Sequence, residues 1–261
     1  MSAFSPAEPS ADAVMPLTGE RTVPDLAEEN YWFRRHEVVY QRLLPLCERH
    51  DVLEAGCGEG YGADLIAGVA RRVVGLDYDE SAVAHVKARY PRVDMRHGNL
   101  AELPLPDADV DVVVNFQVIE HLWDQGQFAR ECLRVLRPNG VLLMSTPNRL
   151  TFSPGLDTPI NPFHTRELNA DELTELLVDG GFGDVVVLGL FHGPRLQEMD
   201  ARHGGSIINA QIDRAVADAP WSPELVADVA AVATTDFDMV AAGQGRPVDD
   251  SLDLIAIAVR P

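Results

Sequence analysis

The sequence has few cysteines and few basic residues, and each shortage argues against a class of protein. Cys47, Cys57 and Cys132 are the only cysteines and show no CxxC spacing, which disfavours a disulfide framework and a thiolate zinc site. Lys and Arg number 21 against 41 Asp and Glu, for a net charge of −20. Nucleic-acid sites need a basic face, and an acidic surface suits an anionic membrane poorly. We therefore expect neither nucleic acid nor a membrane as a partner.

Long apolar runs and a secretory leader are also missing. We find no run of about 20 apolar residues that would predict a transmembrane helix. The first residues lack a basic region followed by an apolar one, so the expected location is cytoplasmic. Residues 1–19 are rich in Ser, Ala and Pro with acidic residues between them, which predicts a disordered tail.

What the sequence does contain is a regular alternation of apolar patterns. Residues 20–50 carry apolar side chains at helical spacing and predict an N-terminal helical cap. Short apolar runs then predict strands at 51–56, 72–77, 93–98, 108–117, 141–148, 184–193 and 251–259. Helical patterns lie at 61–70, 80–90, 127–137 and 169–181, with a turn at 138–140. This alternation predicts an α/β fold with right-handed crossovers and a largely parallel sheet.

One long stretch interrupts this rhythm. Residues 51–193 form the expected core and 251–261 its final strand, but 194–250 intervene. This insertion is predicted to be mostly helical. It is interpreted as a lid or as the surface of a homodimer, with a merely ornamental helix pair as the alternative.

The first strand runs into a glycine-rich turn that indicates a nucleotide-like ligand. The spacing is Gly56-x-Gly58-x-Gly60, whereas dinucleotide loops read GxGxxG and have a third glycine where Tyr61 stands here. The turn is preceded by Glu54, which would repel a pyrophosphate but suits a cationic amino group. The pattern therefore favours S-adenosylmethionine (SAM) over NAD.

Polar residues follow the next strands at positions where the rest of SAM would lie. Asp77 comes 21 residues after Gly56, a spacing that suits hydrogen bonds to ribose hydroxyls. Asn99 and Leu100 follow the third strand, where an adenine is expected, and Asn115 ends the fourth. The alternatives are structural: a turn without ligand, an acid at a helix N-terminus for Asp77, and a turn residue for Asn99.

Four blocks in order resemble one known family. "LEAGCGEG", "GLDYD", "GNLAELPLPDADVDVVVNFQVIEHL" and "VLRPNGVLLMSTPN" are similar to the motifs of class I SAM-dependent methyltransferases. The resemblance covers roughly residues 50–190 and implies a Rossmann-like fold. Its seven-stranded sheet would be mostly parallel, with an antiparallel last strand. It implies that SAM is bound by Glu54, Gly56, Gly58, Gly60, Asp77, Tyr78, Asn99, Leu100, Asn115 and Gln117.

The residues expected to act on the methyl acceptor follow the fourth and fifth predicted strands. Glu120 and His121 follow one strand and His164 follows the other, so they are expected to meet at the carboxyl edge of the sheet. In one interpretation a histidine is a general base for a hydroxyl. In the other, Gln117, Glu120, His121 and His164 hold a divalent cation such as Mg²⁺ or Mn²⁺. That set resembles the ExxEH…H site of some quinone-precursor and small-RNA 2′-O-methyltransferases, with Gln117 replacing the first acid. A purely structural Glu-His pair is the third possibility.

The N-terminal segment "ENYWFRRHE" offers further candidates. Arg34 or Arg35 is suited to bind the SAM carboxylate, and Tyr31 to face its sulfonium. The alternative is a capping segment whose aromatic side chains only cover the edge of the sheet.

These features together predict a SAM-dependent O-methyltransferase acting on a small hydroxylated acceptor. The wording of "TGERTVPDLAEENYWFRRHEVVY" resembles the mycobacterial sugar 1-O-methyltransferases of methylmannose polysaccharide synthesis, which implies a sugar or oligosaccharide acceptor. The alternatives are a methyltransferase acting on a quinol, phenol or other metabolite, and a SAM-binding module without catalysis.

Overall fold

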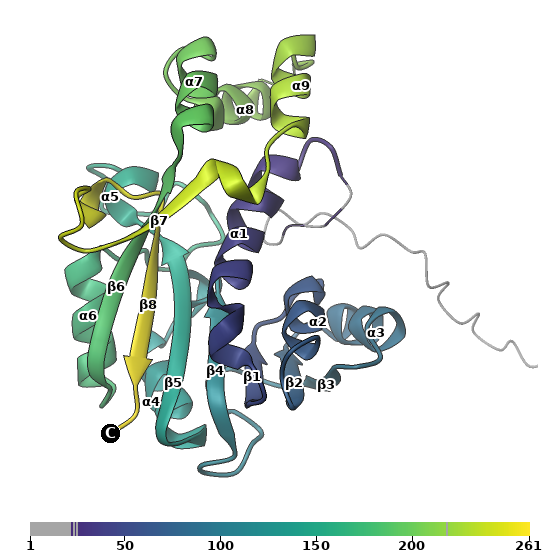
Figure 1. Ribbon diagram of the computed structural model, residues 1–261, viewed down its shortest axis with the longest axis vertical. Coiled ribbons are helices and arrows are strands. Elements are labelled where there is room, and N and C mark those ends of the chain that lie inside the picture. Colours follow the sequence, from purple (N-terminus) through teal and green to yellow (C-terminus); the bar gives the residue numbers. More distant parts are fainter. Residues whose placement is uncertain (1–21, 23, 25, 218) are drawn as a thin grey trace, which may run out of the picture.

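A computed structural model gives the fold and describes residues 22, 24, 26–217 and 219–261; the predicted tail at 1–19 lies outside them. One mixed sheet with helices on both faces forms the body of the molecule (Figure 1). Its strands are β1 Asp51–Ala55, β2 Arg72–Asp77, β3 Asp94–His97, β4 Val110–Phe116, β5 Leu136–Pro147, β6 Gly183–His192, β7 Phe237–Ala241 and β8 Asp253–Val259. The helices are α1 Asn30–Leu43, α2 Tyr61–Ala67, α3 Glu80–Arg89, α4 Gln125–Val135, α5 Arg149–Phe152, α6 Ala170–Asp179, α7 Pro194–Arg202, α8 Ile207–Val216 and α9 Pro223–Ala230.

The sheet has eight strands in the order β3-β2-β1-β4-β5-β8-β6-β7, so the expected number of seven is wrong. Strands β1 to β5 pair in parallel, β8 is antiparallel to both β5 and β6, and β7 is antiparallel to β6. The additional strand is β7, inside the stretch predicted to be helical. It was missed because its apolar pattern spans only five residues beside Asp and Gly. It pairs with β6 and takes its place at the edge of the sheet.

Strand β5 begins earlier than predicted. The expected turn at 138–140 belongs to the strand, which starts at Leu136 and pairs there with Val110. The register shifts between Val110 and Val112, and Asn139 has a φ of 62°. A bulge of this kind absorbs Pro, Asn and Gly without ending the strand.

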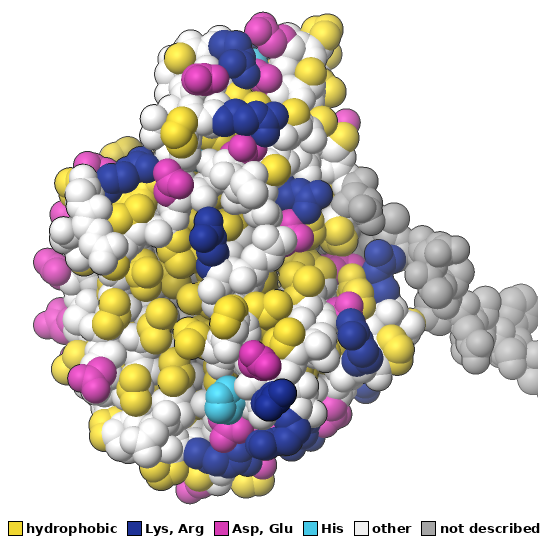
Figure 2. Space-filling view, viewed as in Figure 1, with side chains coloured by type: hydrophobic (Ala, Val, Ile, Leu, Met, Phe, Trp, Pro, Cys, Tyr) yellow, Lys and Arg dark blue, Asp and Glu magenta, His cyan; other side chains and the backbone are white. Residues whose placement is uncertain are grey.

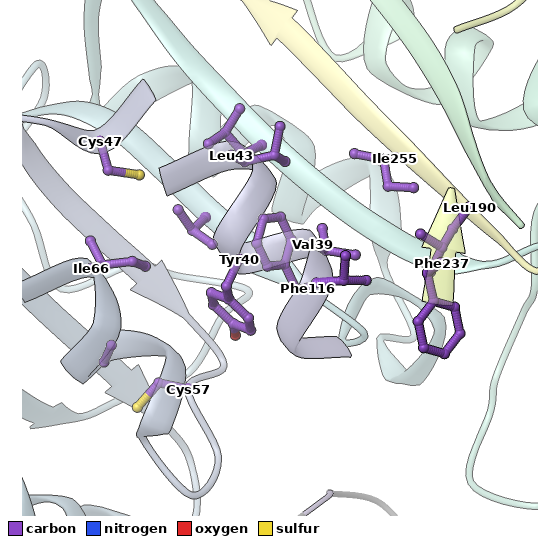
Figure 3. Close-up of a cluster of buried hydrophobic side chains, with 14 of the residues drawn as sticks. Val39, Tyr40, Leu43, Cys47, Cys57, Ile66, Phe116, Leu190, Phe237 and Ile255 are labelled. Atoms are coloured by element: carbon purple, nitrogen blue, oxygen red, sulfur yellow. The ribbon is translucent and has the colours of Figure 1, made fainter. Parts of the chain in front are cut away.

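Each face of the sheet packs into its own hydrophobic cluster because successive strand residues point to opposite faces. Val52, Val112 and Val114 join the cluster beneath α1 and α2, whereas Leu53 and Val113 join the cluster beneath α4 and α6. Figure 3 shows the first cluster, in which side chains of α1 lie beside those of β4 and β8. Helix α1 thus closes one face of the core.

On the side drawn in Figure 2, Lys and Arg side chains lie next to Asp and Glu, and a short band of basic side chains follows the lower edge. Within the part of the chain that the structure describes, no helix is long and apolar enough to cross a membrane. Figure 1 shows α7, α8 and α9 grouped at one end of the molecule, beyond the strands and beside the start of α1.

A buried ion pair fastens α1 to the last strand. Arg35 donates to both carboxylate oxygens of Asp253, at 2.7 Å each, and also to the carbonyl of Leu252. Both charged side chains are almost fully buried, and the neighbouring Asp253 carboxylate raises the pKa of Arg35 against the opposing effect of burial.

Replacing Asp253 with alanine should lower the free energy of unfolding by about 3–5 kcal/mol, because the Arg35 charge would stay buried without its partner. Asp94→Ala is the matched control, since it breaks an exposed pair with Arg96 and should cost less than about 1 kcal/mol. Urea unfolding of both variants measures the difference. Equal losses would contradict a strong role for the buried pair.

Candidate active site

A cavity of about 840 Å³ opens at the carboxyl ends of β1, β2 and β4, where ligands bind in open α/β sheets. The structure brings nine of the predicted residues to its walls: Gly56, Gly58, Asp77, Tyr78, Asn99, Leu100, Gln117, His121 and His164. Cys57, inside the glycine motif, also lines it and is buried. No described residue of 194–250 lines the cavity, so the structure gives the insertion no contact with it.

The glycine loop has a backbone shape that requires glycine. Gly56, Gly58 and Gly60 have φ values of 86°, 51° and 95°, a region that side chains disfavour. A Cβ on Gly60 would also lie 2.5 Å from a methyl of Val86. The amide of Gly58 donates to Asp77 at 2.8 Å. The predicted cofactor loop and the predicted ribose acid are therefore physically joined.

Glu54 and Asn115 lie buried at the ends of β1 and β4, without reaching the cavity wall themselves. Glu54 accepts a hydrogen bond of 2.6 Å from Tyr40, and its other carboxylate oxygen has no partner among the described residues. Burial raises the pKa of Glu54 to about 8. Asn115 donates to the carbonyl of Ala55. The Glu54 carboxyl can therefore lose its proton and become negatively charged when a cation binds nearby.

Asn99 serves as a turn residue and as a cavity wall at once. Its side-chain oxygen accepts from the amide of Ala101 at 2.9 Å, which is the structural alternative that the sequence left open. Leu100 beside it is buried and contributes an apolar surface. The predicted adenine end of the cavity is thus formed by a fixed turn.

The N-terminal candidates do not reach the cavity. Tyr31 is buried and bonds to His192 at 2.7 Å, Arg35 pairs with Asp253, and Arg34 bonds to Glu37. None of the three lines the cavity wall. The prediction that they bind the SAM carboxylate or sulfonium finds no support in their positions.

The same helix presents a different pair to the cavity, His36 and Tyr40. They are four residues apart, as are Tyr31 and Arg35, but they begin further along the helix and so lie on another face. Burial lowers the pKa of His36 to about 4, which keeps its ring neutral at pH 7. The i, i+4 spacing was visible in the sequence, but nothing there indicated which face turns towards the ligand.

Glu59 was not predicted and is the centre of a buried polar network. It lies inside the glycine motif, lines the cavity and accepts from Tyr90 and from the amide of Tyr61. His85 of α3 contacts the same carboxylate at 2.8 Å. These contacts tie the glycine loop to α2 and α3. The sequence signal was the acid between Gly58 and Gly60.

Glu120, His121 and His164 meet as expected from their strands. One ligand atom of each lies within 4.8 Å of the others, and the two imidazole ring centroids are 4.9 Å apart. The side chain of Thr165 donates to the carbonyls of Glu120 and Leu122. These bonds hold the loop after α5 against the end of β4.

The polar environment of this cluster differs from residue to residue. Glu120 is buried and accepts from Thr146 at 3.0 Å, and burial raises its pKa to about 7. His121 contacts the carbonyl of Phe163 through Nδ1 at 3.0 Å. Gln117 lines the cavity nearby in sequence and has a φ of 57°. A non-glycine residue in this region is often found at functional sites.

Part of the cavity wall consists of exposed aromatic and proline side chains. Trp123 is 93 % exposed, and Phe163 is 44 % exposed. Pro159 and Pro162 line the same part of the cavity. An exposed tryptophan contributes little to the core, so the Trp123 ring is accessible to a molecule in the cavity.

Comparison with known proteins agrees with this geometry. Residues 53–144 match the family model described as "Methyltransferase domain". A probable SAM-dependent methyltransferase of Mycobacterium tuberculosis is 76 % identical over 98 % of this chain and 93 % of its own length. One from Mycolicibacterium smegmatis is 76 % identical over 95 % and 96 %. A ubiquinone biosynthesis O-methyltransferase of Bradyrhizobium diazoefficiens is 30 % identical over 55 % of this chain and 62 % of its own.

Solved structures show the same fold at low sequence identity. A SAM-dependent methyltransferase of Thermotoga maritima, described as a possible histamine N-methyltransferase, has a TM-score of 0.60 at 16 % identity over 88 % of this chain and 93 % of that one. The YcgJ protein of Bacillus subtilis has a TM-score of 0.59 at 17 % identity over 86 % and 99 %. With a glycine loop, a ribose acid and near full-length relatives in agreement, the chain belongs to the SAM-dependent methyltransferases.

Proposed function

We propose that the protein transfers the methyl group of SAM to a hydroxyl of a small acceptor, most specifically a sugar or oligosaccharide such as a methylated mannoside. The observation that carries this proposal is the cluster of Glu120, His121 and His164 beside the SAM cavity. Methyl transfer from a sulfonium depends largely on alignment of the two reactants. A hydroxyl must in addition lose its proton, and this cluster contains groups suited to that task.

The hydrogen bonds of the two histidines support this role. The carbonyl of Phe163 accepts from Nδ1 of His121, which places the acceptor lone pair of that ring on Nε2. His164 has a carboxylate at its own Nδ1. Both rings therefore favour the tautomer in which Nε2 acts as a base or as a metal ligand.

The same residues fit a divalent cation. Among the described residues, the buried Glu120 carboxyl accepts from Thr146 and has only the titratable ring of His164 as a nearby positive group. A cation would supply a permanent positive charge. Glu120, His121 and His164 would hold the ion, with Gln117 as the fourth candidate. The nitrogen ligands favour Mn²⁺ over Mg²⁺. When bound, the cation would lower the pKa of the acceptor hydroxyl.

The mouth of the cavity supports a neutral ringed acceptor. Trp123 and Phe163 offer flat apolar surfaces, against which the carbon face of a pyranose or an aromatic ring can lie. A net charge of −20 and the carboxylates of the site disfavour a phosphorylated acceptor. A quinol or phenol acceptor is the second candidate, favoured by the similarity to ubiquinone biosynthesis O-methyltransferases.

A methyl-transfer screen with labelled SAM tests these proposals together. Sugars, quinol precursors and phenols are offered to the protein as prepared, after exhaustive chelation, and after Mn²⁺ or Mg²⁺ is restored. We expect transfer to a sugar hydroxyl that falls at least about tenfold on chelation and returns with the metal. Activity that survives chelation would contradict the cation and leave the histidine base. SAM binding without transfer to any hydroxyl would favour a non-catalytic module.

A further inference from the structure

Glu167 is a buried carboxylate beside the active site, and it has no role in the methyl transfer proposed for Glu120, His121 and His164. It lies between the loop that contains His164 and helix α6, and its side chain is fully buried. One oxygen lies 2.6 Å from Nδ1 of His164. The other has no hydrogen-bond partner among the described residues. Burying a charge in this way is costly, and a leucine would fill similar space without that cost.

Two independent hydrogen bonds specify the tautomer of His164. At Nδ1 the Glu167 carboxylate can only accept, so this nitrogen carries the proton. At Nε2 the partner is the side-chain amide of Asn161, 3.1 Å away. The oxygen of that amide accepts from the backbone of Phe163 at 3.0 Å, which turns its NH₂ group towards the ring. The ring nitrogen facing a donor must present its lone pair.

The hydrogen bonds at Nδ1 and at Nε2 therefore indicate the same tautomer of His164. We propose that Glu167 is a positioning residue that fixes His164 as the Nδ1–H tautomer with the lone pair on Nε2, and that it stabilises the positive charge this ring acquires in the reaction. The proposal rests on the proposed function, because it assigns a role within the same site. It applies equally to a ring that takes the acceptor proton and to one that binds a cation, each of which would replace the Asn161 amide at Nε2, since a carboxylate at Nδ1 strengthens either interaction.

The arrangement also makes the two histidines unequal. His121 has a neutral carbonyl at Nδ1, whereas His164 has a carboxylate there. A hydrogen bond to a charged acceptor is about twice as strong as one to a neutral acceptor. His164 is thus the better electron donor of the pair, and substitutions at Glu167 should act through it alone.

Glu167→Leu and Glu167→Gln test the two parts of the proposal. Leucine removes the acceptor and leaves only the Asn161 amide to hold the ring, so the ring nitrogens of His164, read by ¹⁵N NMR in the protein without metal or substrate, should show an increased share of the Nε2–H tautomer. Glutamine keeps an acceptor oxygen but loses the charge, so the tautomer should be largely kept. In both variants methyl transfer and Mn²⁺ affinity should fall about 10- to 100-fold, with the Kd for SAM unchanged. Glu175→Gln, an exposed residue of the neighbouring helix α6, is the control and should change none of these.

A Glu167→Leu protein that keeps the wild-type tautomer would overturn the proposal. So would variants whose melting temperature falls while kcat and Mn²⁺ affinity stay within about twofold of wild type. If the leucine variant does not fold, the glutamine variant still decides the effect of the charge. A wild-type protein that binds SAM but methylates no hydroxyl would overturn the proposed function instead, while the tautomer measurement would still stand.

Discussion

Replacing His164 with alanine should lower kcat for methyl transfer by about 100- to 10,000-fold, the range that general acid–base groups contribute. The Kd for SAM should change by less than about threefold, because the glycine loop and Asp77 are the expected cofactor contacts. Single-turnover transfer measures the rate, and calorimetry measures SAM binding. His50→Ala changes an exposed histidine away from the cavity and should leave both quantities unchanged.

The double variant His121→Ala/His164→Ala shows whether the two histidines act together in one role or have two separate roles. Residues that act as a unit show effects that are far from additive, so the second substitution should add little to the first. If the fold-decrease in kcat of the double variant equals the product of the two single decreases, the rings act independently, as a base and as an acceptor-binding group. A kcat within about tenfold of wild type for His164→Ala would contradict its place in the reaction altogether.

The positions of these catalytic candidates were predictable because strand order is a strong constraint. Four sequence blocks fixed β1, β2, β4 and β5 in order, and neighbouring parallel strands end at one edge of the sheet. Residues directly after β4 must therefore lie near that edge of the sheet. The approach of His164 followed in the same way, although the loop that contains it has no regular pattern of its own.

Other features depended on contacts that no local pattern encodes. Tyr31 and His36 are both plausible ligand-binding residues on one helix, and only the packing of α1 against β8 and the insertion decides which faces the cavity. The short strand β7 forms because β6 offers it an edge, not because its five residues strongly favour a strand. Glu167 reads as an ordinary helix-start acid until its distance to His164 is known.

Replacing Glu54 with glutamine should weaken SAM binding by about 10- to 100-fold. A hydrogen bond to a charged group contributes about 1.5–3 kcal/mol, and about 1.4 kcal/mol corresponds to tenfold in affinity. The substitution keeps the shape of the side chain and its bond with Tyr40 but removes the negative charge behind the glycine loop that is expected to attract the ammonium group of SAM. Titration calorimetry measures the change. Glu48→Gln, at an exposed site before β1, is the matched control.

The pH dependence of SAM binding gives a sharper test of the same residue. Burial raises the pKa of Glu54 to about 8 in the free protein, so at pH 7 most molecules hold a proton that a bound ammonium would displace. SAM affinity should therefore rise with pH up to about 8, by at most tenfold per unit, with proton release on binding. Calorimetry in buffers of different ionisation enthalpy counts that proton, which Glu54→Gln should abolish.

The stability of the free protein should move in the opposite direction. The folded-state pKa of Glu54 lies above its ordinary value of 4.5, so between about pH 4.5 and 8 the folded chain binds more protons than the unfolded chain. The contribution of Glu54 to the free energy of unfolding therefore decreases as pH rises, by up to about 1.4 kcal/mol per unit. Glu54→Gln should flatten this slope, and Glu120, whose pKa is raised to about 7, should account for part of what remains. A wild-type protein whose SAM affinity stays constant through this window, and whose stability does not decrease across it, would show that Glu54 is already ionised when the cavity is empty.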